Sequence, residues 1–148
     1  CSHPLNFESE LEETGALGVK RAARRKLQHE LGIDPEEVPL DELHYLTRIH
    51  YKSENVPRDG KWGEHEIDYI LFIQRDVKVN ANSNEVKDHR YVNQQQLRQL
   101  VEDSQKKKTD TLITPWFALI VDSFLFKWWQ NLDNLQSQTD QETIHKML

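Results

Sequence analysis

Three acidic residues at alternate positions are the side chains best placed to do chemistry. Glu64, Glu66 and Asp68 lie where Trp-Gly-Glu-His-Glu at 62–66 runs into an apolar, β-prone stretch that ends at Ile73. Because a strand sends alternate side chains to opposite faces, the carboxylates should point the same way, with neighbours about 6.7 Å apart. They would then repel by roughly 2.5 kcal/mol at an effective dielectric of about 20, and a cation would relieve this repulsion. The segment therefore predicts a metal-assisted acid/base site.

The first residues, Cys-Ser-His-Pro, add a thiol and an imidazole. A nearby charge or metal can move the pKa of the Cys1 thiol so that it acts as an acid or a base, and His3 can bind that metal. An inert buried cysteine and a surface histidine would explain the same pair.

Glu30 and Lys26 lie in the last turns of a predicted helix. The macrodipole disfavours a carboxylate near a helix C-terminus, so another group is expected to hold Glu30 there. A divalent metal bridged to a phosphate would do so, with Lys26 nearby to attract the anion. An exposed salt bridge is the alternative interpretation.

Two aromatic residues have a chemical and a structural interpretation. Tyr51 could face Glu64 across a hairpin and relay a proton, or pack as an ordinary strand aromatic. Trp116 could offer its π-face to a developing positive charge, or belong to the core. The remaining histidines lack ligand spacing with one another, and His65 should face away from the glutamates; they are His29, His44, His50, His65 and His89.

Composition limits the class of protein. A chain of 148 residues with 36% hydrophobic residues suits one domain, and its net charge of -6 argues against nucleic acid or an anionic membrane as the main partner. A local basic run at 20–26 suits a small anion, or is a solvated helix face. The lone cysteine and the lack of an 18-residue apolar run indicate a reducing, soluble compartment. Because the chain starts at Cys1 without methionine, we interpret it as a fragment or a processed product.

The elements that position these residues follow from periodicity. Apolar spacings of three and four predict a helix over residues 8–31, ended by Gly32. Strands are expected at 45–51 and from 64 onward, joined by a loop with Asn55, Pro57, Asp59 and Gly60 into a hairpin. A short strand at 89–92, a helix at 94–102, a lysine-rich loop at 106–108 and a helix from Thr114-Pro115 through Trp128 complete the pattern. The polar tail beyond Leu135 should be frayed.

Four segments together resemble a known family. Cys-Ser-His-Pro at 1–4, Arg-Arg-Lys-Leu-Gln-His-Glu-Leu-Gly at 24–32, Trp-Gly-Glu-His-Glu at 62–66 and Thr-Pro-Trp-Phe at 114–117 resemble type 1 isopentenyl-diphosphate isomerase of the animal form, in order and spacing. The resemblance implies an α/β (α+β) fold, a Nudix-like α/β/α sandwich with a mixed sheet. It assigns residues 1–135 to a partial Nudix-type isomerase domain and 136–148 to a polar C-terminal tail.

The Nudix box is only partly present. Its pattern ends R-E-U-x-E-E-x-G-U, with U an aliphatic residue, and five positions match: Arg25, Leu27, Glu30, Gly32 and Ile33. Lys26 and His29 replace two acids, and the earlier glycine and glutamate of the box fall on Leu11 and Leu17. Fewer acids weaken the metal cluster that a hydrolase needs, which favours the isomerase.

The resemblance implies that isopentenyl diphosphate is converted to dimethylallyl diphosphate by adding one proton and removing another. Such a reaction passes through a carbocation-like state and needs an acid, a base and exclusion of water. By position, Glu66 and Tyr51 match the groups that deliver the proton, and Cys1 matches the base. Trp116 matches the ring that stabilises the cation.

The resemblance also implies two metals. His3, Glu64 and Glu66 match ligands of a Zn2+ or Mn2+ ion, while Glu30 matches a ligand of the Mg2+ that bridges to the substrate diphosphate, with the Cys1 carbonyl. Lys26 matches a basic diphosphate contact. The expected partner is a small isoprenoid diphosphate, with no nucleic acid and no membrane, and the protein is expected to be a monomer. The resemblance allows peroxisomal import, but the ending His-Lys-Met-Leu is only a degenerate match to the Ser-Lys-Leu type of address, so the expected location is cytoplasmic, with the peroxisome as the alternative.

The family carries about eighty further residues before the thiol, including two metal-binding histidines, diphosphate contacts and the first strands of the sheet. We therefore expect weak or no activity from these 148 residues by themselves. A Nudix-type diphosphate hydrolase and a non-catalytic diphosphate-binding fragment or paralogue are the alternatives.

Overall fold

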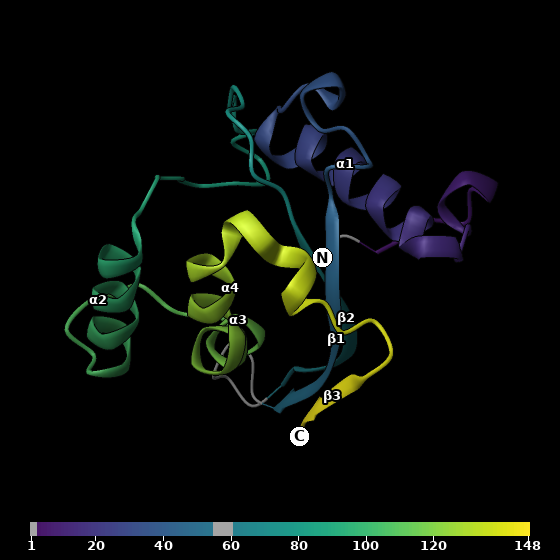
Figure 1. Cartoon of the computed structure of the whole chain (residues 1–148). Coiled ribbons are helices and arrows are strands. Elements are labelled where there is room, and N and C mark those ends of the chain that lie inside the picture. The colour runs from purple at the N-terminus through teal and green to yellow at the C-terminus, as the bar shows by residue number, and fades with distance from the viewer. Residues whose placement is uncertain (1–2, 55–60) are drawn as a thin grey trace. The chain divides into compact units, whose positions relative to one another are not determined.

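The computed structural model describes residues 3–54 and 61–148, which divide into two compact units (Figure 1). Unit 1 is drawn from Cys1–Arg48, Tyr69–His89 and Thr139–Thr143, and unit 2 from Ile49–Asp68, Arg90–Gln138 and Ile144–Leu148. Strands β1 (His44–Glu54) and β2 (Gly63–Phe72) each give residues to both units. The loop expected at Asn55, Pro57, Asp59 and Gly60 lies outside the described residues.

The two predicted strands pair as expected. The sheet has the order β2-β1-β3, where β3 is Ile144–Met147. The Tyr45 ring lies 5.3 Å from that of Tyr69, and the His50 ring 4.9 Å from that of His65. The residue numbers of facing pairs have a nearly constant sum, which is the register of an antiparallel hairpin.

In unit 1, the first helix is shorter than predicted. Two 3-10 turns, Glu8–Glu10 and Thr14–Ala16, precede helix α1, which spans Leu17–Leu31. Gly15 and Ala16 have positive φ angles of 59° and 56°, so the right-handed helix cannot extend through them. The predicted stop is confirmed, because Gly32 adopts the left-handed conformation with φ 62°.

The Asn-rich stretch after β2 closes the end of α1. The Asn80 N–H donates to the Leu31 carbonyl at 2.8 Å, and the Asn82 N–H donates to the Glu30 carbonyl at 2.9 Å. A Cβ on Gly32 would collide with the Asn80 backbone, so only glycine allows this approach. Next to this junction lies a core of three buried residues with partly buried neighbours: Ile33, Val38 and Leu43, with Leu27, Leu31, Leu40, Leu71, Ile73, Val77 and Val79.

Unit 2 contains the predicted second helix but not the short strand before it. Helix α2 spans Gln94–Gln105 and begins with a capping box, in which Asn93 and Gln96 each accept the other's backbone N–H. Residues 89–92 form no strand, and Tyr91 is 79% exposed. Aromatic and β-branched residues favour a strand only where neighbouring strands and packing support them, so the local composition was misleading there.

The last predicted helix begins as expected, with Pro115 in its first turn after Thr114. It runs as α3 (Pro115–Ile120), a π-helical stretch (Val121–Leu125) and α4 (Phe126–Gln130). Helices α3 and α4 lie beside each other (Figure 1). Residues of α2 and of the stretch from Ile113 to Trp129 form the core of unit 2: Leu97, Val101 and Val121, with Val92, Leu100, Ile113, Phe117, Leu125, Phe126 and Trp129. Residues 106–108 are an exposed turn and loop, as predicted.

The C-terminal residues are not frayed. Leu135 is buried within a 3-10 stretch, Leu132–Gln138, and β3 adds to the sheet beside β1. In unit 1, the Asp140 N–H donates to the Leu46 carbonyl at 2.8 Å, and Arg48 donates to the carbonyls of Gln141 and Glu142. Main-chain hydrogen bonds place this polar segment, and they leave no hydrophobic pattern in the sequence.

Candidate active site

Strand pairing brings a tyrosine to two glutamates. The Tyr51 hydroxyl lies 2.9 Å from Oε2 of Glu64 and 3.2 Å from Oε2 of Glu66. The Tyr51 side chain comes from β1 and is fully buried, while both glutamates come from β2. One hydroxyl therefore serves two carboxylates, and the predicted contact between Tyr51 and Glu64 is confirmed.

The acidic face of β2 is also confirmed. Burial alternates along the strand, so that Glu64, Glu66 and Asp68 are partly buried while His65 and Ile67 between them are exposed. Three acidic side chains thus share the inward face of the strand with the buried Ile70, whereas an ordinary half-buried strand turns its apolar side chains inward. Carboxylates turned inward cost stability, and departures of this kind are expected at functional sites.

The carboxylates on this face raise the pKa values of their neighbours. Burial first, and then the charges of Glu66 and Glu64, raise the pKa of Asp68 to about 6. Burial, the hydrogen bond to Glu64 and the neighbouring carboxylates raise the pKa of Tyr51 well above its ordinary range. The phenol therefore keeps its proton at neutral pH and donates it in a hydrogen bond. A group in this cluster that accepts a proton or a cation lowers the repulsion among the carboxylates.

The cluster fits a divalent cation in its chemistry. Two carboxylates that converge on one point offer the hard oxygen ligands preferred by Mg2+ and Mn2+, which Zn2+ also accepts. Within residues 3–54 and 61–148, no three His, Cys, Asp or Glu side chains form a group that could hold a metal ion. The third predicted ligand, His3, belongs to unit 1, and its grouping with Glu64 and Glu66 stays a prediction.

Trp116 belongs to the same unit as this cluster and is more open than a core residue. It lies in the first turn of α3, with its side chain 38% exposed and its ring edge against Phe117 at 5.5 Å. Trp128, in contrast, is 3% exposed. The Trp116 ring therefore keeps an exposed surface, whereas Trp128 is a packing residue.

In unit 1, Glu30 and Lys26 form the salt bridge that was the alternative interpretation. Lys26 Nζ lies 2.8 Å from Glu30 Oε1, and both side chains are partly buried. The Asn82 N–H donates to the Glu30 carbonyl, so the backbone that carries the Glu30 side chain is held in place at the end of α1. The predicted roles of Glu30 with Mg2+ and of Lys26 with a diphosphate stay predictions.

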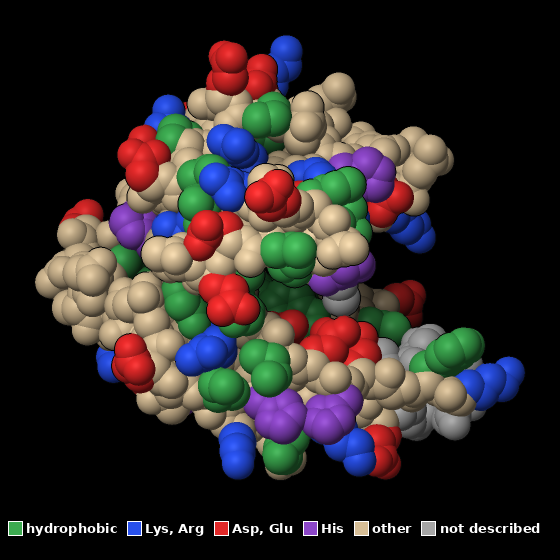
Figure 2. All heavy atoms as spheres, turned by 90° about the vertical axis from the view of Figure 1, so that its right-hand side faces the viewer, with side chains coloured by type: hydrophobic (Ala, Val, Ile, Leu, Met, Phe, Trp, Pro, Cys, Tyr) green, Lys and Arg blue, Asp and Glu red, His purple; other side chains and the backbone are tan. Residues whose placement is uncertain are grey.

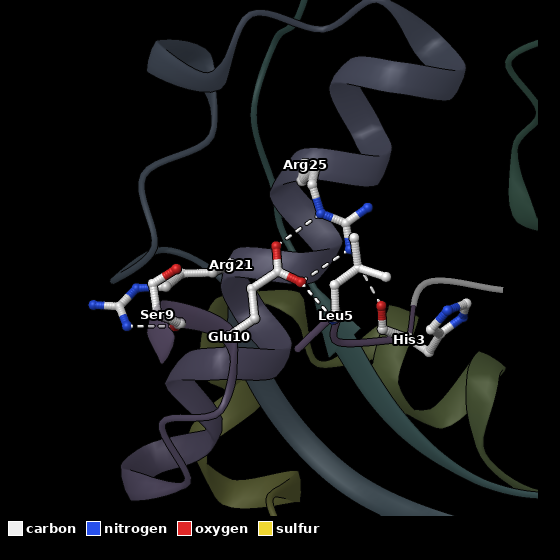
Figure 3. A network of polar contacts seen from close by, with 6 residues as sticks. All are labelled: His3, Leu5, Ser9, Glu10, Arg21 and Arg25. Atoms are coloured by element: carbon white, nitrogen blue, oxygen red, sulfur yellow. Dashed lines mark hydrogen bonds and ion pairs between the residues drawn. The ribbon is translucent and has the colours of Figure 1, made fainter. Parts of the chain in front are cut away.

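A second ion pair in unit 1 was not predicted (Figure 3). The Arg25 guanidinium contacts both carboxylate oxygens of Glu10, through Nε at 2.7 Å and Nη2 at 3.0 Å. These bonds lower the pKa of the buried Glu10 carboxyl, and the pair raises the pKa of Arg25. Sequence spacing had placed the earlier acid of the box on Leu17. The two 3-10 turns bring Glu10 to Arg25 instead, and no linear motif reveals this contact.

The same pair fixes the start of the described chain. The Arg25 Nη2 also donates to the His3 carbonyl at 3.2 Å, and the Leu5 N–H donates to Glu10 at 2.8 Å (Figure 3). Helix α1 therefore holds the segment that carries His3. Cys1, the predicted thiol base, lies outside the described residues.

Comparison with known proteins gives a consistent result. The family model described as NUDIX domain matches residues 10–117. The chain is 53% identical over 147 residues to isopentenyl-diphosphate Delta-isomerase 1 of Mesocricetus auratus and 52% identical to that of Bos taurus, covering 99% of this chain and 63% of each relative. It is 52% identical over 149 residues to isopentenyl-diphosphate Delta-isomerase II of Camptotheca acuminata, of which it covers 47%. The chain thus spans less than two thirds of the length of these relatives.

No helix among the described residues is long and apolar enough to cross a membrane.

Proposed function

Because the chain belongs to the Nudix domain family, we propose that it carries most of the catalytic residues of an enzyme that isomerises isopentenyl diphosphate to dimethylallyl diphosphate. The names of relatives about half identical to it support this proposal. The observation that carries it is the Tyr51 hydroxyl within hydrogen-bond distance of Glu64 and Glu66, on the inward face of β2.

The reaction moves a double bond without oxidation or reduction. A proton adds to the terminal alkene carbon, which leaves positive charge on the tertiary carbon. A different proton then leaves the neighbouring methylene, and its bonding electrons form the new double bond. Because one proton is gained and one is lost, the site needs an acid and a base on opposite faces of the substrate.

Glu66 and Tyr51 are the proposed acid side. The raised pKa keeps the proton on Tyr51, which makes the phenol a poor acid by itself. Tyr51 can pass its proton on only while it regains one from a neighbouring carboxyl group, so the acid is the hydrogen-bonded pair. Tyr51 is fully buried and Glu66 partly buried, so few water molecules can reach this pair and capture the cation.

Cys1 is the proposed base and Trp116 the group that stabilises the cation. A π-face near the tertiary carbon lowers the energy of the charged state by about 0.5–2 kcal/mol, depending on how dry the site is. The exposed ring of Trp116 is compatible with this role. The thiol of Cys1 removes the second proton as a thiolate.

The proposed metal ligands are His3, Glu64 and Glu66 for Zn2+ or Mn2+, and Glu30 for Mg2+. When bound, such cations neutralise the carboxylates and the substrate diphosphate. Among the residues themselves, Lys26 is proposed to contact the diphosphate, and it would have to exchange its bond with Glu30 to do so.

We further propose that the partner of this chain is a small isoprenoid diphosphate, and that it binds neither nucleic acid nor a membrane. We also propose that it is a monomer and that its location is cytoplasmic or peroxisomal. The net charge of -6 supports a small ligand over nucleic acid, and the lone cysteine suits a reducing compartment.

The test is proton NMR of isopentenyl diphosphate in heavy water, with phosphate release followed in parallel. Because the chain spans 63% of the animal relatives, it should be assayed alone and as a fusion protein in which the segment preceding the match in the Mesocricetus auratus relative is joined before Cys1. Isomerisation that requires the Cys1 thiol supports the proposal. A hydrolase would release phosphate and would keep this activity in Cys1→Ala. A binding fragment would catalyse neither isomerisation nor hydrolysis.

A further inference from the structure

A hollow of about 350 Å³ lies on one face of α1 in unit 1. Its walls come from that helix, from the 3-10 turn Glu8–Glu10 and from the turn that begins at Pro35. The residues that line it are Ser9, Glu10, Arg21, Arg24, Arg25, Gln28 and Pro35. Those on α1 recur at spacings of three and four, so they share one face of the helix. Lys26 and Glu30 lie on the opposite side of a helix with about 3.6 residues per turn, so the hollow is separate from the proposed diphosphate and Mg2+ contacts.

Positive charge predominates in this hollow. Among the described residues that line it, only Glu10 is acidic, and its carboxylate is already bound by Arg25 through Nε at 2.7 Å and Nη2 at 3.0 Å. Figure 2 shows Lys and Arg side chains (blue) gathered in its upper part, at the height of α1 in Figure 1, with Asp and Glu (red) among them. Arg21 and Arg24 keep an uncompensated charge in a protein of net charge -6, which favours an anion at this place.

Arg24 is the residue of this hollow with the strongest need of a ligand. It is partly buried, and in the part of the chain that the structure describes its side chain makes no hydrogen bond and no ion pair. A guanidinium has five N–H donors and keeps its positive charge in proteins. Because charged groups withdrawn from water are normally paired, a partly buried arginine without a partner indicates that an anion completes the site.

Arg21, one turn earlier on α1, is held in position beside it. Its Nη1 donates to the Ser9 carbonyl at 2.6 Å, next to the pair of Glu10 and Arg25 (Figure 3). This bond uses one of the N–H donors of Arg21, so the others remain for a ligand. Arg21 and Arg24 are like charges three residues apart on a helix, and an anion bound between them would remove their repulsion.

The donors favour a phosphate group over other anions. Arginine forks bind phosphate through pairs of charge-assisted hydrogen bonds, and Gln28 on the same helix face adds a neutral amide donor. A phosphate monoester carries a charge of about -1.5 to -2 at pH 7 and three acceptor oxygens, which suits two guanidinium groups better than a single carboxylate does. A recess in an acidic protein suits a small soluble molecule rather than a nucleic acid or an anionic membrane.

We propose that Arg21, Arg24 and Gln28 form a binding site for the phosphate group of a small soluble molecule, on the face of α1 opposite to Lys26 and Glu30. The basic run at 20–26 is thereby divided between the two sides of the helix. The site does not depend on the proposed isomerase function, because it shares no residue with the candidate active site.

The first test is a titration of the isotope-labelled chain with inorganic phosphate at constant ionic strength, in which NMR follows the arginine Nε–H signals. The signals of Arg21 and Arg24 should shift and saturate. That of Arg75, which is paired with Glu42 elsewhere in unit 1, should stay in place. The absence of a saturable shift at Arg24, or an equal shift at Arg75, overturns the proposal.

The second test compares two variants with the same change of charge. Arg24→Gln should weaken phosphate binding by about tenfold or more in a calorimetric titration, because the charged fork is lost. Its fold should be unchanged by circular dichroism, since Arg24 has no partner in the described part of the chain. Lys20→Gln removes a cation of the same helix that does not line the hollow, and it should bind like the parent chain. Equal losses in the two variants, or unchanged affinity in Arg24→Gln, overturn the proposal.

A third measurement distinguishes a soluble ligand from a lipid headgroup. Phosphatidylcholine vesicles that contain phosphatidic acid carry the same kind of phosphate group at a surface, and they should not sediment the chain. Sedimentation that Arg24→Gln abolishes, in the absence of binding to free phosphate, would contradict the assignment of a small soluble ligand.

Discussion

The hydroxyl of Tyr51 donates a hydrogen bond to Glu64 across the β1–β2 hairpin, at 2.9 Å and from a fully buried ring. The same oxygen lies 3.2 Å from Glu66, so one hydroxyl lies between two carboxylates of like charge. The chemistry of the site therefore depends on the register of β1 and β2, because a shift of one residue would move Tyr51 away from both glutamates.

Removing that hydroxyl should affect catalysis more than folding. Tyr51→Phe in the fusion protein should reduce the isomerisation rate by about 10²-fold or more, the lower end of what a positioned acid contributes. It should cost about 1–3 kcal/mol of unfolding free energy, because the Glu64 carboxylate loses the hydrogen bond from Tyr51. Rates by NMR and urea unfolding measure the two effects. Tyr45→Phe removes a hydroxyl from the same strand in unit 1, and a similar loss of rate in that variant would contradict the assignment.

Metal binding should depend on the carboxylates of β2. A divalent cation that binds only the folded protein stabilises it by about 2.7 kcal/mol at a concentration 100 times its dissociation constant. Mn2+ should therefore raise the melting temperature of the parent chain, and a chelator should reverse the rise. Glu64→Gln should weaken Mn2+ binding at least tenfold and remove most of this stabilisation. Asp110→Asn makes the same charge change at an exposed position of unit 2, and an equal loss there would indicate a general charge effect.

The pair of Glu10 and Arg25 should make stability depend on pH. The hydrogen bonds from Arg25 lower the pKa of folded Glu10, so its stabilising effect is present above the ordinary glutamate range near 4.5 and is lost as the pH falls through the folded value. Glu10→Gln should cost about 1.5–3 kcal/mol at pH 7 and lose less stability than the parent on acidification. Glu13→Gln, at an exposed position nearby, should follow the parent.

Hydrogen exchange gives a local readout of the same pair. The Leu5 N–H bonds to Glu10, so its exchange should accelerate in Glu10→Gln while amides in α2 stay unchanged. An unaltered Leu5 exchange rate would show that the ion pair does not hold the segment carrying His3.

The features of the fold and of the candidate site that could be predicted from the sequence are those that depend on neighbouring residues in the chain. The acidic face of β2 followed from strand alternation, and the Gly32 stop and the Pro115 start followed from backbone preferences. The contact of Glu10 with Arg25 depends on two 3-10 turns with positive φ at Gly15 and Ala16, which periodicity does not encode.

Contacts that require register or main-chain pairing were predicted less well. The hairpin made Tyr51 a candidate partner of Glu64, but the facing of His50 and His65 needed the register to one residue, and this pair was dismissed from its spacing. Strand β3 arose in a polar tail because main-chain bonds need no apolar pattern. The strand expected at 89–92 failed because only local composition supported it.

The two tryptophans should separate catalysis from packing. Trp116→Leu should slow isomerisation about 2- to 30-fold, which corresponds to a cation–π energy of about 0.5–2 kcal/mol, while Trp116→Phe should retain part of the rate. Trp128→Ala removes a 3% exposed ring and should destabilise unit 2 by about 3–5 kcal/mol. Kinetic and unfolding measurements on the same variants would contradict this division if Trp116→Leu chiefly lost stability and kept its rate.

The most direct test of the central claim is the proton NMR experiment in heavy water on the fusion protein with Mg2+ and Zn2+. We expect dimethylallyl diphosphate with deuterium incorporated from the solvent, no phosphate release, loss of both signals in Cys1→Ala, and a much slower reaction from the 148 residues alone. Phosphate release without isomerisation, or an isomerisation rate unaffected by Cys1→Ala, would contradict the assignment of this chain as the acid/base part of an isopentenyl-diphosphate isomerase.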